Sequence, residues 1–231
     1  MKKIKQYKKL LDIGTYESCG IDDEKLSRYY SFQFCLKYLS PIKIPEILEL
    51  GTCRSFVDGK YEGCNMDDIR YWKRDNFEKW DWGAGCFSLV FGQEIPDANL
   101  TSVDIAVSHI NRCKAMTDSL GIKCNHVMSD SIKFLELTEK KFNLIYLDTG
   151  DMTPIESTAT IQLLEAKILV ERNLLIQNGI LLIDDVLNKT PRQMGDNSGL
   201  GKSKYSIPFL LSNGFSVVFK GYQYILKKDM K

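Results

Sequence analysis

Short runs of aliphatic residues recur along the chain, and five of them end in a carboxylate. Segments of helical length separate one run from the next, and this alternation is typical of the buried strands of a parallel sheet with helical crossovers. The predicted strands are Glu46–Leu50, Leu100–Asp104, His126–Ser129, Phe142–Leu147 and Ile180–Ile183. Because ligands of such sheets bind beyond the carboxyl ends of the strands, we expect the acids to line a binding edge.

Apolar residues at helical spacing fill the segments around these strands. The predicted helices are Leu26–Leu39, Gly83–Ile95, Ser108–Leu120, Ile132–Glu139, Ile155–Ile176 and one that begins at Ile207–Leu211. Two further β segments, Phe215–Phe219 and Gln223–Leu226, predict a closing hairpin. The whole pattern predicts an α/β fold: a Rossmann-like, doubly wound, mostly parallel seven-stranded sheet with a C-terminal antiparallel hairpin.

Chain length and a hydrophobic content of 44% allow a full-sized core, so we predict a single domain over residues 1–231. Residues 1–40 form a predicted N-terminal helical extension. Residues 52–82 are polar but carry many aromatic side chains, which favours an ordered flap over a disordered linker. This flap would leave the sheet at the edge where the ligand is expected.

Composition narrows the range of partners. The net charge of +1 gives no support for a nucleic-acid partner. The longest apolar stretches are far shorter than the ~20 residues that span a bilayer, and no apolar signal segment follows the basic start, so no membrane partner is expected. Seven scattered cysteines fit reduced thiols. We therefore expect a cytoplasmic protein that acts on a small molecule, with a homodimer left open.

The strand-end motifs resemble those of class I S-adenosylmethionine-dependent methyltransferases. The motifs are Glu49-Leu50-Gly51 after the first strand, Asp104 after the second and Asp130-Ser131 after the third, and the resemblance covers residues 44–227. It implies that S-adenosylmethionine is the cofactor and that an acid after the second strand accepts the ribose hydroxyls. The cofactor-binding residues that it implies are Glu49, Gly51, Thr52, Gly83, Gly85, Asp104, Ile105, Asp130, Ser131 and Asp148.

Within that class, Leu144–Asp148 and Gly179–Asp185 are similar to motifs of the catechol and caffeoyl-coenzyme-A O-methyltransferases. That resemblance implies a divalent ion, Mg²⁺ or a similar cation, held by Asp148, Asp184 and Asp185. It also makes Asp148 the catalytic residue. The ion would bind a hydroxyl of a small molecule or sugar and lower its pKa before methyl transfer.

The chain departs from the family pattern at two places. Gly51 is separated from Gly83-Ala84-Gly85 by the flap, so which glycines approach the cofactor is open. Asp151 stands where catechol-type enzymes carry a basic lysine, which leaves His109, His126, Lys202 and Lys204 as bases by residue type only.

A cluster of carboxylates also requires a neutralising partner, since like charges at close range raise one another's pKa. That partner is either a metal ion or a cationic side chain, with Lys202 and Arg192 as candidates.

Other interpretations stay open. Glu49 and Asp104 could instead cap helices or accept loop amides. Asp104 lies 19 residues after Gly85, near the spacing of a nicotinamide dehydrogenase, but no G-x-G-x-x-G motif follows a strand. Gly201-Lys202-Ser203 lacks the preceding glycine of a phosphate-binding loop. A non-catalytic relative that binds a ligand or partner protein is the remaining alternative.

Overall fold

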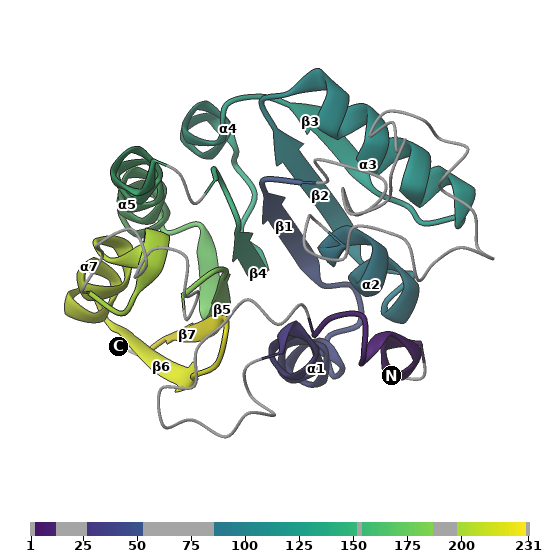
Figure 1. The fold of residues 1–231 in the computed structure, drawn as a ribbon, viewed down its shortest axis with the longest axis horizontal. Coiled ribbons are helices and arrows are strands. Elements are labelled where there is room, and N and C mark those ends of the chain that lie inside the picture. The colour runs from purple at the N-terminus through teal and green to yellow at the C-terminus, as the bar shows by residue number, and fades with distance from the viewer. Residues whose placement is uncertain (1–2, 13–26, 53–85, 152–153, 187–197, 230–231) are drawn as a thin grey trace.

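The computed structural model describes residues 3–12, 27–52, 86–151, 154–186 and 198–229. They contain a seven-stranded sheet in the order β3-β2-β1-β4-β5-β7-β6, which confirms the predicted α/β architecture (Figure 1). The strands are β1 Glu46–Leu50, β2 Asn99–Asp104, β3 Asn125–Met128, β4 Phe142–Leu147, β5 Leu175–Ile183, β6 Phe215–Phe219 and β7 Tyr224–Lys228.

The pairing of the strands separates a parallel part from an antiparallel part. β1 pairs in parallel with β2 and β4, and the parallel ladder continues to β3 on one side and β5 on the other. β7 is antiparallel to both β5 and β6, as the predicted hairpin requires. The chain builds outward from β1 to β3 and then returns to β4 on the opposite side of β1. The topological switch point, where such sheets bind ligands, therefore lies between β1 and β4.

Helices cover both faces of the sheet (Figure 1). The short helix η1 (Ile4–Tyr7) packs on one face with α1 (Arg28–Leu39), α2 (Phe87–Glu94) and α3 (Val107–Ser119), whereas α4 (Ser131–Leu137), α5 (Ile155–Glu171) and α7 (Ser206–Ser212) pack on the other. Alternate residues of β1 serve the two cores: Ile47 joins the first cluster, and Leu48 and Leu50 join the second. This alternation follows from the two-residue period of a strand.

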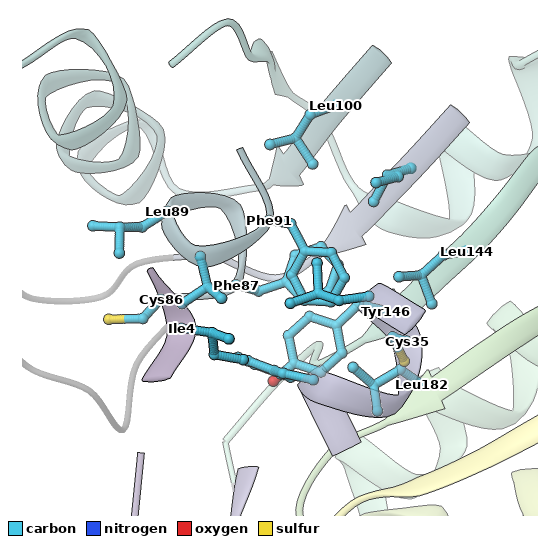
Figure 2. Close-up of a cluster of buried hydrophobic side chains, with 14 of the residues drawn as sticks. Ile4, Cys35, Cys86, Phe87, Leu89, Phe91, Leu100, Leu144, Tyr146 and Leu182 are labelled. Carbon is cyan, nitrogen blue, oxygen red and sulfur yellow. The ribbon is translucent and has the colours of Figure 1, made fainter. Parts of the chain in front are cut away.

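Aromatic rings form the centre of the first core (Figure 2). The Phe87 ring stacks on Phe91 at a centroid distance of 4.1 Å and on Tyr146 at 4.6 Å. Offset-stacked aromatic pairs contribute about 0.5–1.5 kcal/mol beyond the area that they bury. The packing holds the Tyr146 ring rigidly in β4, so its hydroxyl has a defined position near the strand end.

The helix predicted over Ile155–Ile176 is too long, because α5 ends at Glu171. Asn173 has φ +54°, the Asn173 amide donates to Val170 O, and the Leu174 amide donates to Leu169 O. These two bonds form a Schellman cap, in which asparagine can take the place of the usual glycine. The apolar residues after Asn173 therefore belong to β5, which is longer than predicted.

The start of the chain is attached to the body of the fold. The Ile4 amide donates to Glu94 Oε1 at 2.6 Å, and the Tyr7 hydroxyl donates to Gln93 at 3.0 Å. In the described part of residues 1–40, the helical segments η1 and α1 pack on the first core. The predicted flap lies outside the described residues except for Thr52, as do Gly83, Gly85 and Arg192.

Within the described residues, no helix combines the length and apolar character needed to cross a membrane. Among the described residues, Cys35, Cys86, Cys113 and Cys124 are free thiols.

Candidate functional site

The carboxyl ends of β1, β2 and β4 are joined by backbone hydrogen bonds. The Gly51 amide donates to Val103 O, and the Asp148 amide donates to Leu50 O, both at 2.9 Å. The acids that follow these strands therefore lie along one edge of the sheet, as the sequence predicts.

Gly51 has a structural reason to be glycine. Its φ is +83°, and a Cβ atom there would lie 2.5 Å from the Asp148 carbonyl oxygen. Glycine adopts positive φ without steric penalty and allows this close approach of two backbone segments. Gly51 thus brings the ends of β1 and β4 together.

Glu49 lies fully buried beneath α2. Its Oε2 accepts hydrogen bonds from three hydroxyls, those of Thr52 at 3.1 Å, Ser88 at 2.6 Å and Ser102 at 2.5 Å. Its Oε1 is buried and has no hydrogen-bond partner among the described residues. Burial raises the pKa of Glu49 well above its usual range, although the three hydroxyls act in the opposite direction.

The pKa of Asp104 is shifted in the opposite direction. Its carboxylate accepts the amides of Thr52 at 3.0 Å and Ala106 at 2.8 Å, and His109 Nδ1 lies 3.1 Å away. Burial works against the charge, but these contacts lower the pKa of Asp104 below its usual value. Asp104 stays ionised and accepts loop amides, so the structure displays the alternative role considered for it.

Apolar side chains are exposed beside Asp104. Ile105 follows Asp104 in the sequence and is 71% exposed. Met128 is the cross-strand partner of Asp104 on β3 and is 61% exposed. Most residues of their type are buried in soluble proteins. Together they place apolar surface next to an ionised acid at the strand ends.

The pair after β3 has a visible helix-capping role. Asp130 is the N-cap residue of α4, and its side chain accepts the Lys133 amide at 3.0 Å. Ser131 begins the helix and is buried. The bonds of Asp130 are those of an ordinary cap.

The three aspartates predicted as a cluster do meet. One oxygen from each of Asp148, Asp184 and Asp185 lies within 4.8 Å of the others. The side chain of Asp184 is fully buried, whereas those of Asp148 and Asp185 are 15% and 13% exposed. Only these two can be reached from outside.

Arg28, from the start of α1, neutralises Asp184. Its Nε donates to Oδ1 at 3.2 Å and its Nη2 to Oδ2 at 2.5 Å, while Nη2 lies 3.8 Å from Asp185 Oδ1. The Tyr146 hydroxyl lies 2.8 Å from Asp184 Oδ2 and 3.2 Å from Asp148 Oδ2, and Gln223 donates to Asp184 Oδ1 at 2.8 Å. Asp184 is therefore saturated with donors.

Lys202 neutralises the other two acids. Its Nζ lies 2.8 Å from Asp148 Oδ1, 3.2 Å from Asp185 Oδ2 and 3.4 Å from the Gly150 carbonyl oxygen. Its side chain is 1% exposed. The two acids supply the neutralising contacts that a buried ammonium requires.

The charges in the cluster shift one another's pKa. Burial and the neighbouring Asp184 raise the pKa of Asp148 to about 7, against the opposing effect of Lys202. Burial also disfavours the charge on Asp184, but Arg28 and Lys202 overcome it and hold its pKa below the usual range. For Lys202, the three aspartates outweigh burial and raise its pKa.

The donor set suits a divalent ion chemically, because hard carboxylate oxygens are the ligands that Mg²⁺ prefers. The oxygens, however, already have partners. Lys202 and Tyr146 engage Asp148, Arg28 and Gln223 engage Asp184, and Lys202 and the Tyr222 hydroxyl engage Asp185. As arranged, these residues do not fit a bound divalent ion, since the Lys202 ammonium lies between the two accessible carboxylates.

Several residues of this cluster were missed in the sequence. Arg28 is the first residue of α1, Tyr222 and Gln223 lie in the turn between β6 and β7, and Tyr146 is an inward residue of β4. One available signal was Gln223, a polar residue directly before the apolar hairpin strand β7.

Of the candidate bases, Lys202 is the one whose contacts place it in the cluster. His109 contacts Asp104, His126 contacts Thr117, and Lys204 pairs with Glu156. Gly201-Lys202-Ser203 is thus a short 3-10 turn that delivers a lysine to the strand ends.

Several solved structures resemble this chain in fold. No protein-family model and no curated protein matches the chain. Among solved structures, a Podospora anserina methyltransferase, PaMTH1, in its SAH-bound form has a TM-score of 0.58 and 16% identity over 100% of this chain and 89% of that one. A putative O-methyltransferase from Klebsiella pneumoniae has a TM-score of 0.52 and 10% identity over 100% and 91%.

A further match has a longer chain. NSun6 from Pyrococcus horikoshii, with SFG, has a TM-score of 0.55 and 13% identity over 87% of this chain and 52% of that one. The chain has the class I methyltransferase fold. At these identities the likeness concerns the fold, and it agrees with the seven-stranded order and antiparallel β7. The catechol-type assignment within that fold stays a prediction.

Proposed function

We propose that this chain is an S-adenosylmethionine-dependent methyltransferase that acts on a hydroxyl group of a small molecule or sugar. One observation carries the proposal. In a sheet with the order 3-2-1-4-5-7-6, Thr52 lies at the switch point and donates hydrogen bonds to both Glu49 and Asp104. A dinucleotide-binding dehydrogenase typically has the order 3-2-1-4-5-6. The antiparallel β7 between β5 and β6 therefore favours the methyltransferase over the dehydrogenase alternative.

The residues at the strand ends suit an adenosyl amino acid. Asp104 carries charge and has acceptor capacity for ribose hydroxyls, since a carboxylate offers about four lone-pair sites and three donors contact it. Ile105 and Met128 offer apolar surface for an adenine ring. Glu49 Oε1 is a buried acceptor with no hydrogen-bond partner among the described residues, and we assign it to the amino-acid end of the cofactor. When bound, S-adenosylmethionine supplies an electrophilic methyl group on a sulfonium.

Asp148 is the catalytic residue in this proposal. Its carboxylate is partly exposed, and Tyr146 and Lys202 fix its orientation from both oxygens. A carboxylate so placed can accept a hydrogen bond from an acceptor hydroxyl, orient its oxygen and take its proton as the O–CH₃ bond forms. The predicted Mg²⁺ has no part in this proposal, because the Lys202 ammonium holds the oxygens that it would need.

Calorimetric titration of the purified chain with S-adenosylhomocysteine tests the cofactor class, with NADH as the matched alternative ligand. We expect micromolar binding of the first and none of the second. Absence of S-adenosylhomocysteine binding would sink the methyltransferase proposal.

The acceptor class is tested separately, by transfer of a radiolabelled methyl group to a panel of phenols, sugars and amines. Label is expected on hydroxyl-bearing acceptors only. Cofactor binding without transfer to any member of the panel would instead support the non-catalytic, ligand-binding alternative.

A further inference from the structure

The Lys202 ammonium has as many neighbouring oxygen atoms as it has N–H donors. An ammonium has three N–H donors and no acceptor, and three oxygens surround this one: Asp148 Oδ1, Asp185 Oδ2 and Gly150 O, at 2.8, 3.2 and 3.4 Å. Two are carboxylate oxygens and one is a backbone carbonyl. These oxygen types are also the usual ligands of hard divalent cations.

The backbone is shaped to bring Lys202 to this place. Gly201 has φ +56°, and a Cβ atom there would lie 2.5 Å from the Asp185 carbonyl oxygen. On the other side of the lysine, the Ser203 hydroxyl donates to Gln162 at 2.7 Å and anchors the turn to α5. The lysine is therefore delivered by a fixed turn packed against Asp185 itself.

The charge balance of the cluster depends on this lysine. Arg28 pairs with the fully buried Asp184, and its Nη2 also lies 3.8 Å from Asp185 Oδ1. The Lys202 ammonium contacts both Asp148 and Asp185 and so offsets their mutual repulsion. Without the lysine, Asp148 and Asp185 would face each other across a space lined by oxygens.

We infer that the Lys202 ammonium is the resident cation of the Asp148–Asp184–Asp185 cluster and takes the place of a divalent ion. The wild-type cluster therefore excludes divalent ions. Loss of the lysine side chain creates a divalent-cation site formed by Asp148, Asp185 and the Gly150 carbonyl. The inference rests on charge and geometry and holds whether or not the chain transfers methyl groups.

Titration with Mn²⁺, followed by the electron paramagnetic resonance signal of the free ion, tests this inference on the full chain. We expect Lys202→Ala to bind one Mn²⁺ at least about tenfold more tightly than any site of the wild type. Lys204→Ala removes a neighbouring lysine that pairs with Glu156 outside the cluster, and it should match the wild type. The double variant Lys202→Ala/Asp185→Asn should lose the gained binding.

Two results would overturn the inference: wild type that binds Mn²⁺ as tightly as Lys202→Ala, or a folded Lys202→Ala that gains no binding. Thermal unfolding with and without Mn²⁺ covers the case in which Lys202→Ala does not fold in metal-free buffer. Recovery of a cooperative transition on adding Mn²⁺, absent in the double variant, would support a cation site. If Mn²⁺ does not restore a cooperative transition in Lys202→Ala, that result also contradicts the inference.

Discussion

Arg28 and Asp184 form a buried, two-pronged ion pair, although 156 positions separate them in the sequence. The pair joins the N-terminal helix α1 to the end of β5, with both side chains almost completely removed from solvent. The N-terminal extension is therefore an integral part of the acid cluster and contributes one of the two cations that the described residues place there.

Replacing Arg28 with Met should destabilise the fold strongly. Removing one partner of a buried ion pair leaves an uncompensated charge, and the loss is about 3–5 kcal/mol. Urea unfolding measures it. Lys114→Met, which breaks an exposed pair with Asp118, should change stability by less than about 1 kcal/mol. Adding Asp184→Asn to the Arg28→Met variant should restore part of the loss, and a purely additive double variant would contradict this account.

Alanine substitutions at Gly51 and Gly121 test how much the close approach of the Gly51 and Asp148 backbones contributes to stability. Both have positive φ, +83° and +67°, but a Cβ atom at Gly51 would meet the Asp148 carbonyl, whereas nothing lies within 4 Å at Gly121. Gly121→Ala should lose about 1–2 kcal/mol from the left-handed conformation alone. Gly51→Ala should lose about 1–3 kcal/mol more from the clash. Equal midpoint shifts in denaturant titrations would show that the strand ends can separate without penalty.

Asp104→Asn tests the assigned ribose contact. The amide keeps a similar shape but loses the charge, and hydrogen bonds to charged groups contribute about 1.5–3 kcal/mol. We expect S-adenosylhomocysteine to bind about 10- to 100-fold more weakly in calorimetric titration. Asp118→Asn on the exposed surface of α3 is the control. An unchanged affinity, with the fold verified by circular dichroism, would leave Asp104 as a loop-stabilising residue only.

Glu165 should make the stability depend on pH. It is fully buried in α5, with Thr149 donating to Oε1 at 2.6 Å and no partner for Oε2 among the described residues. Burial raises its pKa from 4.5 to about 7, against the effect of hydroxyl hydrogen bonds. Because the folded state holds this proton more tightly, its contribution to stability is full below pH 4.5 and declines as pH rises toward 7.

Glu165→Gln should therefore gain stability relative to the wild type as pH rises, by about 3 kcal/mol between pH 4 and 8. Urea unfolding at a series of pH values gives the comparison. Parallel stability profiles for the two proteins would mean that Glu165 does not carry this proton in the folded state.

Local patterns were sufficient for most of the sheet. The predicted strands before β5 and the closing hairpin lie where the structure has them, with shifts at their ends, because alternation and turn residues are local signals. The end of α5 was misplaced, since the run after Asn173 is apolar enough to continue a helix or to begin a buried strand. Only the Schellman cap and the pairing of β5 with β4 and β7 separate these two outcomes.

In the candidate site, too, local sequence patterns predicted one part and long-range contacts decided the other. The sequence alone determined that five acids lie at or directly after the carboxyl ends of predicted strands: Glu49, Asp104, Asp148, Asp184 and Asp185. They therefore share an edge, because parallel strands present their carboxyl ends together. Tertiary structure decided what lies among those acids. Arg28 arrives from α1 on one face of the sheet and Lys202 from the turn before α7 on the other, and no local pattern specifies a contact between residues so far apart in the chain. Low-dielectric burial then makes that pairing energetically necessary, since unpaired carboxylates could not stay charged there.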